Sequence, residues 1–128
     1  MMSKSTLIAI AASAALTACA TTESRDVSPA FGFTDDAGKS HFVTGHIVKT
    51  YDDNFFTTSR AYKLIVQDSG ATVIEGPLDP YSFAGTAAGA IGQKPAVAHC
   101  TSVQKSPQWW DVTCEIAVEG KVVGKLTF

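Results

Sequence analysis

Blocks of positive charge are absent from this sequence. Its 10 Lys and Arg residues are spread among 12 Asp and Glu residues, and the formal net charge is −2 at pH 7. A protein that binds nucleic acid through the phosphates needs a basic patch to neutralise them. The charge pattern therefore predicts that nucleic acid is not a partner.

Common catalytic and metal-binding motifs are also missing. Gly38-Lys39-Ser40 matches the end of a phosphate-binding loop, but the first glycine of that motif would fall at Phe33. The Gly-x-Ser-x-Gly pattern of a nucleophilic serine does not occur. His41 and His46 lie five apart on an expected strand, so their side chains point to opposite faces. We expect a protein that is not an enzyme and has no cofactor or metal.

Long apolar runs are absent too, and the one short run lies near the N-terminus. From Leu7 to Ala18, 12 residues are apolar or small, and Lys4 precedes them. A helix of this length covers about 18 Å, whereas a hydrocarbon core of about 30 Å needs around 20 residues. The segment is therefore typical of a secretory signal and too short for a transmembrane anchor.

Leu16-Thr17-Ala18-Cys19 ends this run and resembles the lipobox of bacterial lipoproteins. The resemblance implies that residues 1–18 are a signal peptide that is removed, and that Cys19 is lipidated with diacylglycerol and an amide-linked acyl chain such as palmitate. Two or more acyl chains hold a protein stably on a membrane. In this family a residue other than Asp after the cysteine, here Ala20, favours the outer membrane, with the domain in the periplasm. The inner membrane and the cell surface stay open as alternatives.

Cysteine is scarce, with three residues in the chain. Once Cys19 is assigned to lipid, Cys100 and Cys114 remain as an even pair in an oxidising compartment. A bond between them would close a loop of about 15 residues and stabilise the fold by roughly 3 kcal/mol in the chain-entropy model. We expect this disulfide, because the spacing fits no common metal site.

Helical periodicity is missing from the rest of the chain, which falls into short alternating strands. Residues 19–30 are small and polar, and we expect them to form the lipidated cysteine and a flexible tether. Residues 31–128 suffice for a single all-β domain. We expect a small antiparallel barrel or a two-layer sandwich built of hairpins, with an OB-like barrel as one option. Residues 77–94 are expected to be irregular.

Turn residues predict hairpin loops of three residues, each ending in Gly or Asn. Four places fit this pattern: residues 36–38, 52–54, 68–70 and 118–120. In the last hairpin a three-residue loop pairs Ile116 with Val122 and keeps the apolar residues on one face, which a two-residue turn would not do. The loop at 68–70 would place Lys63 opposite Glu75.

Aromatic residues give the positive indication of function. Phe55 and Phe56 follow a charged turn, and Trp109 and Trp110 are adjacent. Neighbouring residues of a strand face opposite sides, and the alternation places Trp110 inside and Trp109 outside. An exposed tryptophan is typical of a binding surface. The other interpretation is that a second layer or the 77–94 segment covers Trp109.

These features predict a non-catalytic, membrane-anchored envelope lipoprotein whose β-domain binds another protein. Trp109, Phe55 and Phe56 are the candidate binding residues. Assembly accessories, exclusion or immunity factors and inhibitors of cell-wall hydrolases are proteins of this kind. The alternative is a small barrel that binds a glycan, lipid or oligonucleotide, which a convergence of Trp109 with Tyr81 would favour.

Replacing Cys19 with Ala should abolish lipid attachment, because the thiol that receives diacylglycerol is then missing. The variant should leave the membrane fraction, and fractionation followed by mass measurement of the protein checks this. Membrane retention equal to that of the wild type would contradict the lipobox interpretation.

Overall fold

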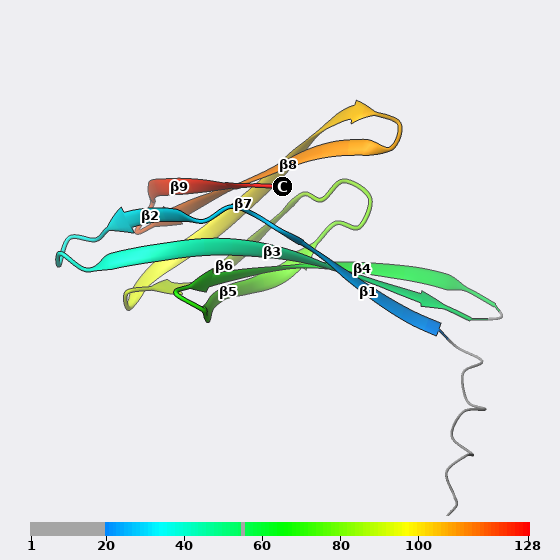
Figure 1. Ribbon diagram of the computed structural model, residues 1–128, viewed down its shortest axis with the longest axis horizontal. Helices are drawn as coiled ribbons and strands as arrows, with labels where there is room; N and C mark the ends of the chain where they lie inside the picture. Colours follow the sequence, from blue (N-terminus) through cyan, green and yellow to red (C-terminus); the bar gives the residue numbers. More distant parts are fainter. Residues whose placement is uncertain (1–19, 55) are drawn as a thin grey trace, which may run out of the picture.

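The computed structural model describes residues 20–54 and 56–128, which form one curled antiparallel sheet (Figure 1). The strands are β1 (Ala20–Val27), β2 (Phe31–Thr34), β3 (Ser40–Asp53), β4 (Thr58–Asp68), β5 (Ala71–Leu78), β6 (Gly85–Ile91), β7 (Lys94–Ser106), β8 (Trp109–Val118) and β9 (Lys121–Thr127). From β3 onward the order in the sheet follows the chain, while β1 and β2 both pair with β3. The all-β antiparallel class is thus confirmed, as a meander and not the Greek-key order of an OB barrel.

Within these described residues, no helix is long and apolar enough to cross a membrane. The predicted signal segment, Cys19 and Phe55 lie outside the described residues.

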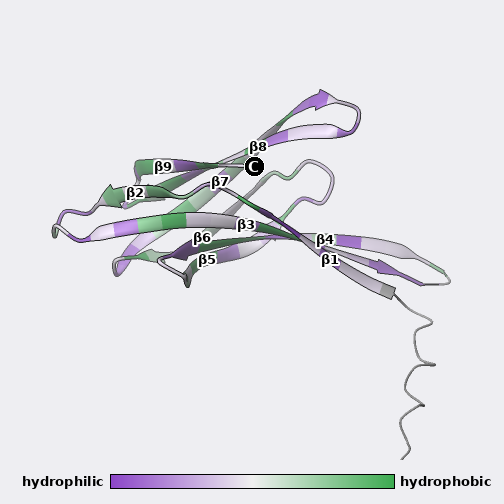
Figure 2. Cartoon of the chain, in the orientation of Figure 1, coloured by the Kyte–Doolittle hydropathy of each residue, from purple (hydrophilic) through white to green (hydrophobic). Residues whose placement is uncertain are grey.

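The sheet curls until β2 approaches β9, which makes a half-barrel around one apolar core (Figure 1). No strand pairing joins β2 to β9 in the part of the chain that the structure describes. Two glycines let the ends come together: a Cβ on Gly124 would lie 2.3 Å from the Phe31 ring, and one on Gly45 would lie 2.7 Å from the Leu126 side chain. Figure 2 shows apolar stretches on β2, β3 and β9 in this part of the fold.

The β4–β5 and β8–β9 hairpins share a design that differs from the predicted three-residue loops. The first turns through Ser69 and Gly70 and the second through Glu119 and Gly120, with φ between 50° and 91° at all four residues. Positive φ at both central residues defines a two-residue type I′ turn. In each hairpin the second strand then contains one extra residue, which forms a β-bulge.

The bulges explain why the predicted registers are wrong. Ile116 lies opposite Gly124 instead of Val122, because the bulge in β9 restores the inward alternation that a longer loop was expected to provide. In the β4–β5 hairpin, Lys63 does not lie directly opposite Glu75. The two side chains still form an ion pair at 2.8 Å, from a diagonal position.

Of the other two predicted loops, one is right. The loop at residues 36–38 is confirmed, because the Asp35 N–H donates to the carbonyl of Lys39 across its base at 2.9 Å. The loop at residues 52–54 is wrong, since β3 continues to Asp53.

The stretch expected to be a flexible tether is largely a strand. β1 pairs with β3 along its whole length, from Ala20 opposite Asp53 to Val27 opposite His46. Residues 21–27 are exposed, so the strand depends on its backbone ladder and needs no apolar alternation. Polar composition therefore did not distinguish this edge strand from a linker.

Residues 77–94, expected to be irregular, contain β6. This strand pairs with β5 at a single position, Ile74 with Gly89. A Cβ on Gly89 would lie 1.9 Å from the carbonyl oxygen of Val73. The small residues of β6 therefore allow its backbone to approach that of β5 closely, which is a common role of glycine in strands.

The Cys100–Cys114 disulfide is present, as predicted. The two residues lie directly opposite each other on β7 and β8, with a Cα–Cα distance of 3.9 Å, and both are buried.

Gly89→Ala should lower the free energy of unfolding by roughly 1–3 kcal/mol, because the added methyl group forces β5 and β6 apart. Gly32→Ala is the matched control, since its Cβ would meet nothing closer than 3.5 Å. Urea unfolding of both variants measures the difference. Equal stabilities of the two variants would contradict this account of the crossing.

Candidate binding site

A cavity lined by aromatic rings lies between the β1–β3 side of the half-barrel and β8. Its volume is about 360 Å³. The lining includes Asp26 of β1, Lys49 of β3, Phe83 of the β5–β6 loop, Trp109 and Trp110 of β8, and the C-terminal Phe128. We call this the aromatic cavity.

Lys49 supplies a fixed positive charge to the aromatic cavity. Its ammonium pairs with the Asp26 carboxylate at 2.8 Å. It also lies 5.2 Å from the centre of the Phe83 ring and 5.8 Å from that of Tyr62. Cation–π contact of this kind holds a lysine over a ring face, so the charge and the aromatic surface are positioned together.

Phe83 reaches the cavity from a strained loop. Its φ is +62°, which is uncommon for a residue with a bulky side chain. Asp79 builds the loop, because its carboxylate accepts hydrogen bonds from the N–H groups of Tyr81 and Ser82 at 2.8 and 2.9 Å. These hydrogen bonds lower the pKa of Asp79, and the one from Tyr81 has the largest effect. Backbone strain of this kind costs on the order of 1–3 kcal/mol, and it clusters at functional sites.

A row of rings extends from Phe83 in both directions. Tyr62 lies 4.9 Å away between ring centres and Trp110 lies 6.4 Å away. Beyond Tyr62, the hydroxyl of Tyr51 is 3.0 Å from the Tyr62 hydroxyl. Burial is the main reason that the pKa of Tyr62 rises to about 12, so this phenol stays neutral at physiological pH.

The two tryptophans lie as the alternation predicted. Trp109 is 63% exposed, whereas Trp110 is partly buried against Phe83. The β5–β6 loop therefore covers Trp110 and leaves Trp109 at the rim, where the indole N–H donates to Asp111 at 3.0 Å.

Phe56 does not join Trp109. It lies in the β3–β4 turn, is 94% exposed and does not line the aromatic cavity. Tyr81 does not line it either, but lies 5.2 Å from the Arg60 guanidinium. The convergence of Trp109 with Tyr81 that would have favoured the ligand-binding alternative is therefore not found.

The sequence reasoning missed the other residues of the aromatic cavity. Asp26 and Lys49 looked like ordinary charges, and Phe83 lay in a segment expected to be irregular. Asp79-Pro80 is a turn signal that indicated the loop, but no sequence signal indicated the left-handed backbone of Phe83.

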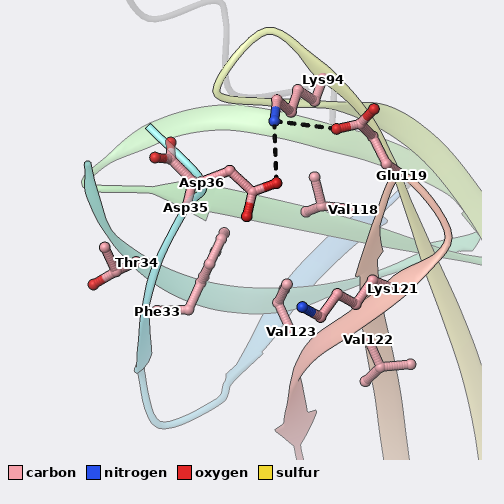
Figure 3. A pocket seen from close by; sticks show the side chains of 10 residues that line it. All are labelled: Phe33, Thr34, Asp35, Asp36, Lys94, Val118, Glu119, Lys121, Val122 and Val123. Carbon is pink, nitrogen blue, oxygen red and sulfur yellow. Dashed lines mark ion pairs between the residues drawn. The ribbon is translucent and has the colours of Figure 1, made fainter. Parts of the chain in front are cut away.

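A second cavity, of about 400 Å³, lies between β2 and the β8–β9 hairpin (Figure 3). At its rim the Lys94 ammonium is 3.2 Å from Glu119 and 3.6 Å from Asp36. Both carboxylates raise the pKa of Lys94, and Glu119 has the larger effect. Three carboxylates (Asp35, Asp36 and Glu119) and two lysines (Lys94 and Lys121) line the cavity, which contains none of the predicted binding residues.

His41 and two carboxylates form a buried titratable cluster that invites comparison with a catalytic site. The side chain of His41 is 1% exposed, and its Nε2 lies 2.7 Å from Asp35 while its Nδ1 lies 2.6 Å from Asp68. The Phe33 ring stacks on the imidazole at 4.9 Å. Both ring nitrogens are paired with carboxylates, so the cluster joins the β2–β3 loop to the end of β4.

Comparison with models of known protein families, with curated proteins and with solved structures finds no match.

Protonation of His41 should couple stability to pH. The hydrogen bonds to Asp35 and then Asp68 raise the pKa of His41. The stabilisation that protonated His41 gives is complete below the pKa of histidine in the unfolded chain, about 6.5. It is lost as the pH rises through the higher pKa of His41 in the folded protein. The pKa of Asp35 is lowered, chiefly by His41, so its own contribution is lost only in acid.

We therefore expect the wild-type protein to lose stability as the pH rises from 6 to 9, measured by urea unfolding. Asp35→Asn should flatten this dependence, because it removes one acceptor of the imidazolium. Asp36→Asn is the control, since Asp36 is exposed and does not contact His41. If the two variants showed the same pH dependence, the cluster would not be the cause.

Proposed function

We propose that this protein is a bacterial envelope lipoprotein, lipidated at Cys19 and held at the outer membrane, whose β-domain binds another envelope protein in the periplasm. The exposed indole of Trp109 at the rim of the aromatic cavity is the observation that carries the binding role. The lipobox carries the anchor. Catalysis has no part in the proposal.

The aromatic cavity shares its tryptophan side chains with interaction hot spots. Protein interfaces are enriched in tryptophan, tyrosine and arginine, and their strongest contacts fill well-packed pockets. Trp109 offers most of its ring to a partner, while Trp110, Phe83 and Phe128 form apolar walls behind it. An apolar side chain of a partner that enters the cavity would lose water on several sides at once.

The fixed backbone beneath the cavity supports tight binding. β8, which carries Trp109, is tied to β7 by the buried disulfide and by a ladder that extends to Trp109 itself. The Asp79 cap holds the Phe83 loop. A site whose walls are ordered in advance loses little conformational entropy when the partner binds.

A second candidate is a small glycan ligand in the same cavity. A volume of about 360 Å³ lies within the usual range for small-molecule sites. The cavity combines ring faces with the polar groups of Lys49, Asp26 and Gln108, which suits a sugar with both apolar and hydroxyl surfaces.

Trp109→Ala should weaken the complex with the partner by roughly 30-fold or more, the effect of removing a hot-spot side chain worth about 2 kcal/mol. Capture from envelope extract identifies the partner, and titration with the purified partner gives the dissociation constant. Phe42→Ala is the matched control, because Phe42 is a similarly exposed aromatic residue (62%). It lies near the start of β3 and does not line the aromatic cavity.

Capture of no protein, or equal capture by both variants, would count against a protein-binding role of Trp109. Titration with soluble cell-wall glycan fragments, monitored by tryptophan fluorescence, distinguishes glycan binding from protein binding. Saturable quenching that Trp109→Ala abolishes would favour the glycan ligand.

A further inference from the structure

The start of β1 fixes where a lipid on Cys19 would emerge. Ala20 lies opposite Asp53 at the far end of β3. The chain therefore enters the sheet at Ala20, beside the β3–β4 turn, and a lipid on the preceding residue would be attached at this end of the molecule. We call this end of the molecule the arm: the end of the β3–β4 hairpin together with the first residues of β1, which extends beyond the rest of the sheet (Figure 1).

The tip of the arm presents an aromatic side chain to the outside. Asn54 shapes the turn, because its side-chain oxygen accepts hydrogen bonds from the N–H groups of Phe56 and Thr57, both at 2.9 Å. The side chain of Phe56 is 94% exposed. A phenyl ring with this exposure lowers its free energy when it moves from water into an apolar phase.

Behind the tip lies a group of amphipathic side chains. The Arg60 guanidinium is 5.9 Å from the centre of the Tyr51 ring and 5.2 Å from that of Tyr81. Tyr81 is 70% exposed. Tyrosine rings favour the water–membrane interface, and a guanidinium matches the geometry of a phosphate. In the described part of the chain, no carboxylate lies within ion-pair distance of Arg60.

We propose that the tip of the arm rests in the headgroup region of the bilayer, with Phe56 toward the acyl chains and Arg60 and Tyr81 at the level of the phosphates. This inference rests on the proposed lipidation of Cys19, which brings the arm to the membrane. β1 then joins the lipid to the domain as part of the sheet, and the domain approaches the membrane in one orientation.

Electrostatics does not require an anionic membrane. The arm also carries Asp52 and Asp53, which accept hydrogen bonds from the hydroxyl groups of Thr21 and Thr58 at 2.7 and 3.0 Å. Together with Arg60 these groups leave a small negative charge. Contact with zwitterionic lipid is therefore the appropriate test, because repulsion from anionic lipid would confuse it.

Fluorescence quenching by brominated acyl chains tests the inference on the acylated full-length mature protein in phosphatidylcholine vesicles. Tryptophan is placed at the tip by Phe56→Trp, and at the control position by Phe42→Trp. Trp109 and Trp110 are replaced by Phe in both proteins. Residue 42 lies 11 residues from Asp53 along β3, or about 36 Å, which is beyond the reach of the quencher when the tip is inserted.

We expect quenching of the Phe56→Trp protein to exceed that of the Phe42→Trp protein at least twofold. Equal quenching of the two acylated proteins would overturn the arm contact and leave the lipid anchor intact. A protein mass without acyl chains would overturn both the anchor and the inference that rests on it.

A second measurement needs no substitution. Amide hydrogen exchange of the acylated wild-type protein should slow at residues 54 and 56–57 on transfer from detergent to vesicles, and should not change at residues 36–38. Equal change at both turns would overturn the proposal, even if the tryptophan variants failed to fold.

Discussion

A single sheet can bury an apolar face only against itself, and the structure depends on this constraint. With no helix or second sheet to cover the inner face in the described chain, the strands must curl until their ends meet. The meeting point allows little space. The Phe31 ring lies where any side chain on Gly124 would be, and Leu126 lies close to Gly45. Two missing side chains thus let the core close without a backbone ladder between β2 and β9.

The same constraint explains the irregular features of the strands. A strand that runs around a curved sheet must bend, and bulges in β5 and β9 provide bends directly after tight turns. At β6 the ladder to β5 is reduced to one pair, and there the backbone of Gly89 approaches that of Val73. The aromatic cavity lies between β3 and β8, which are not neighbours in the sheet. The curvature that closes the core therefore also brings Lys49 and Trp110 to one site.

The predictable part of this fold is the part that local chemistry decides. Alternating strands, the loop at 36–38 and the outward face of Trp109 each follow from neighbouring residues, and the Cys100–Cys114 pair follows from the number of cysteines. The registers of two hairpins did not follow, because a type I′ turn with a bulge and a longer loop both keep the faces consistent. The aromatic cavity was out of reach for a different reason. Asp26, Phe83 and Trp110 meet only through the curvature of the whole sheet, which depends on contacts between strands distant in the chain.

β1 changes what kind of attachment the proposed anchor would be. A flexible tether of about ten residues would let a domain explore a shell on the order of 17 Å around its lipid. A strand paired from Ala20 onward has no such slack. The domain would keep a fixed distance from the membrane and a fixed orientation. It would therefore meet only molecules that pass at that distance and in a matching orientation. Encounter with a partner would then be a search in two dimensions along the membrane plane.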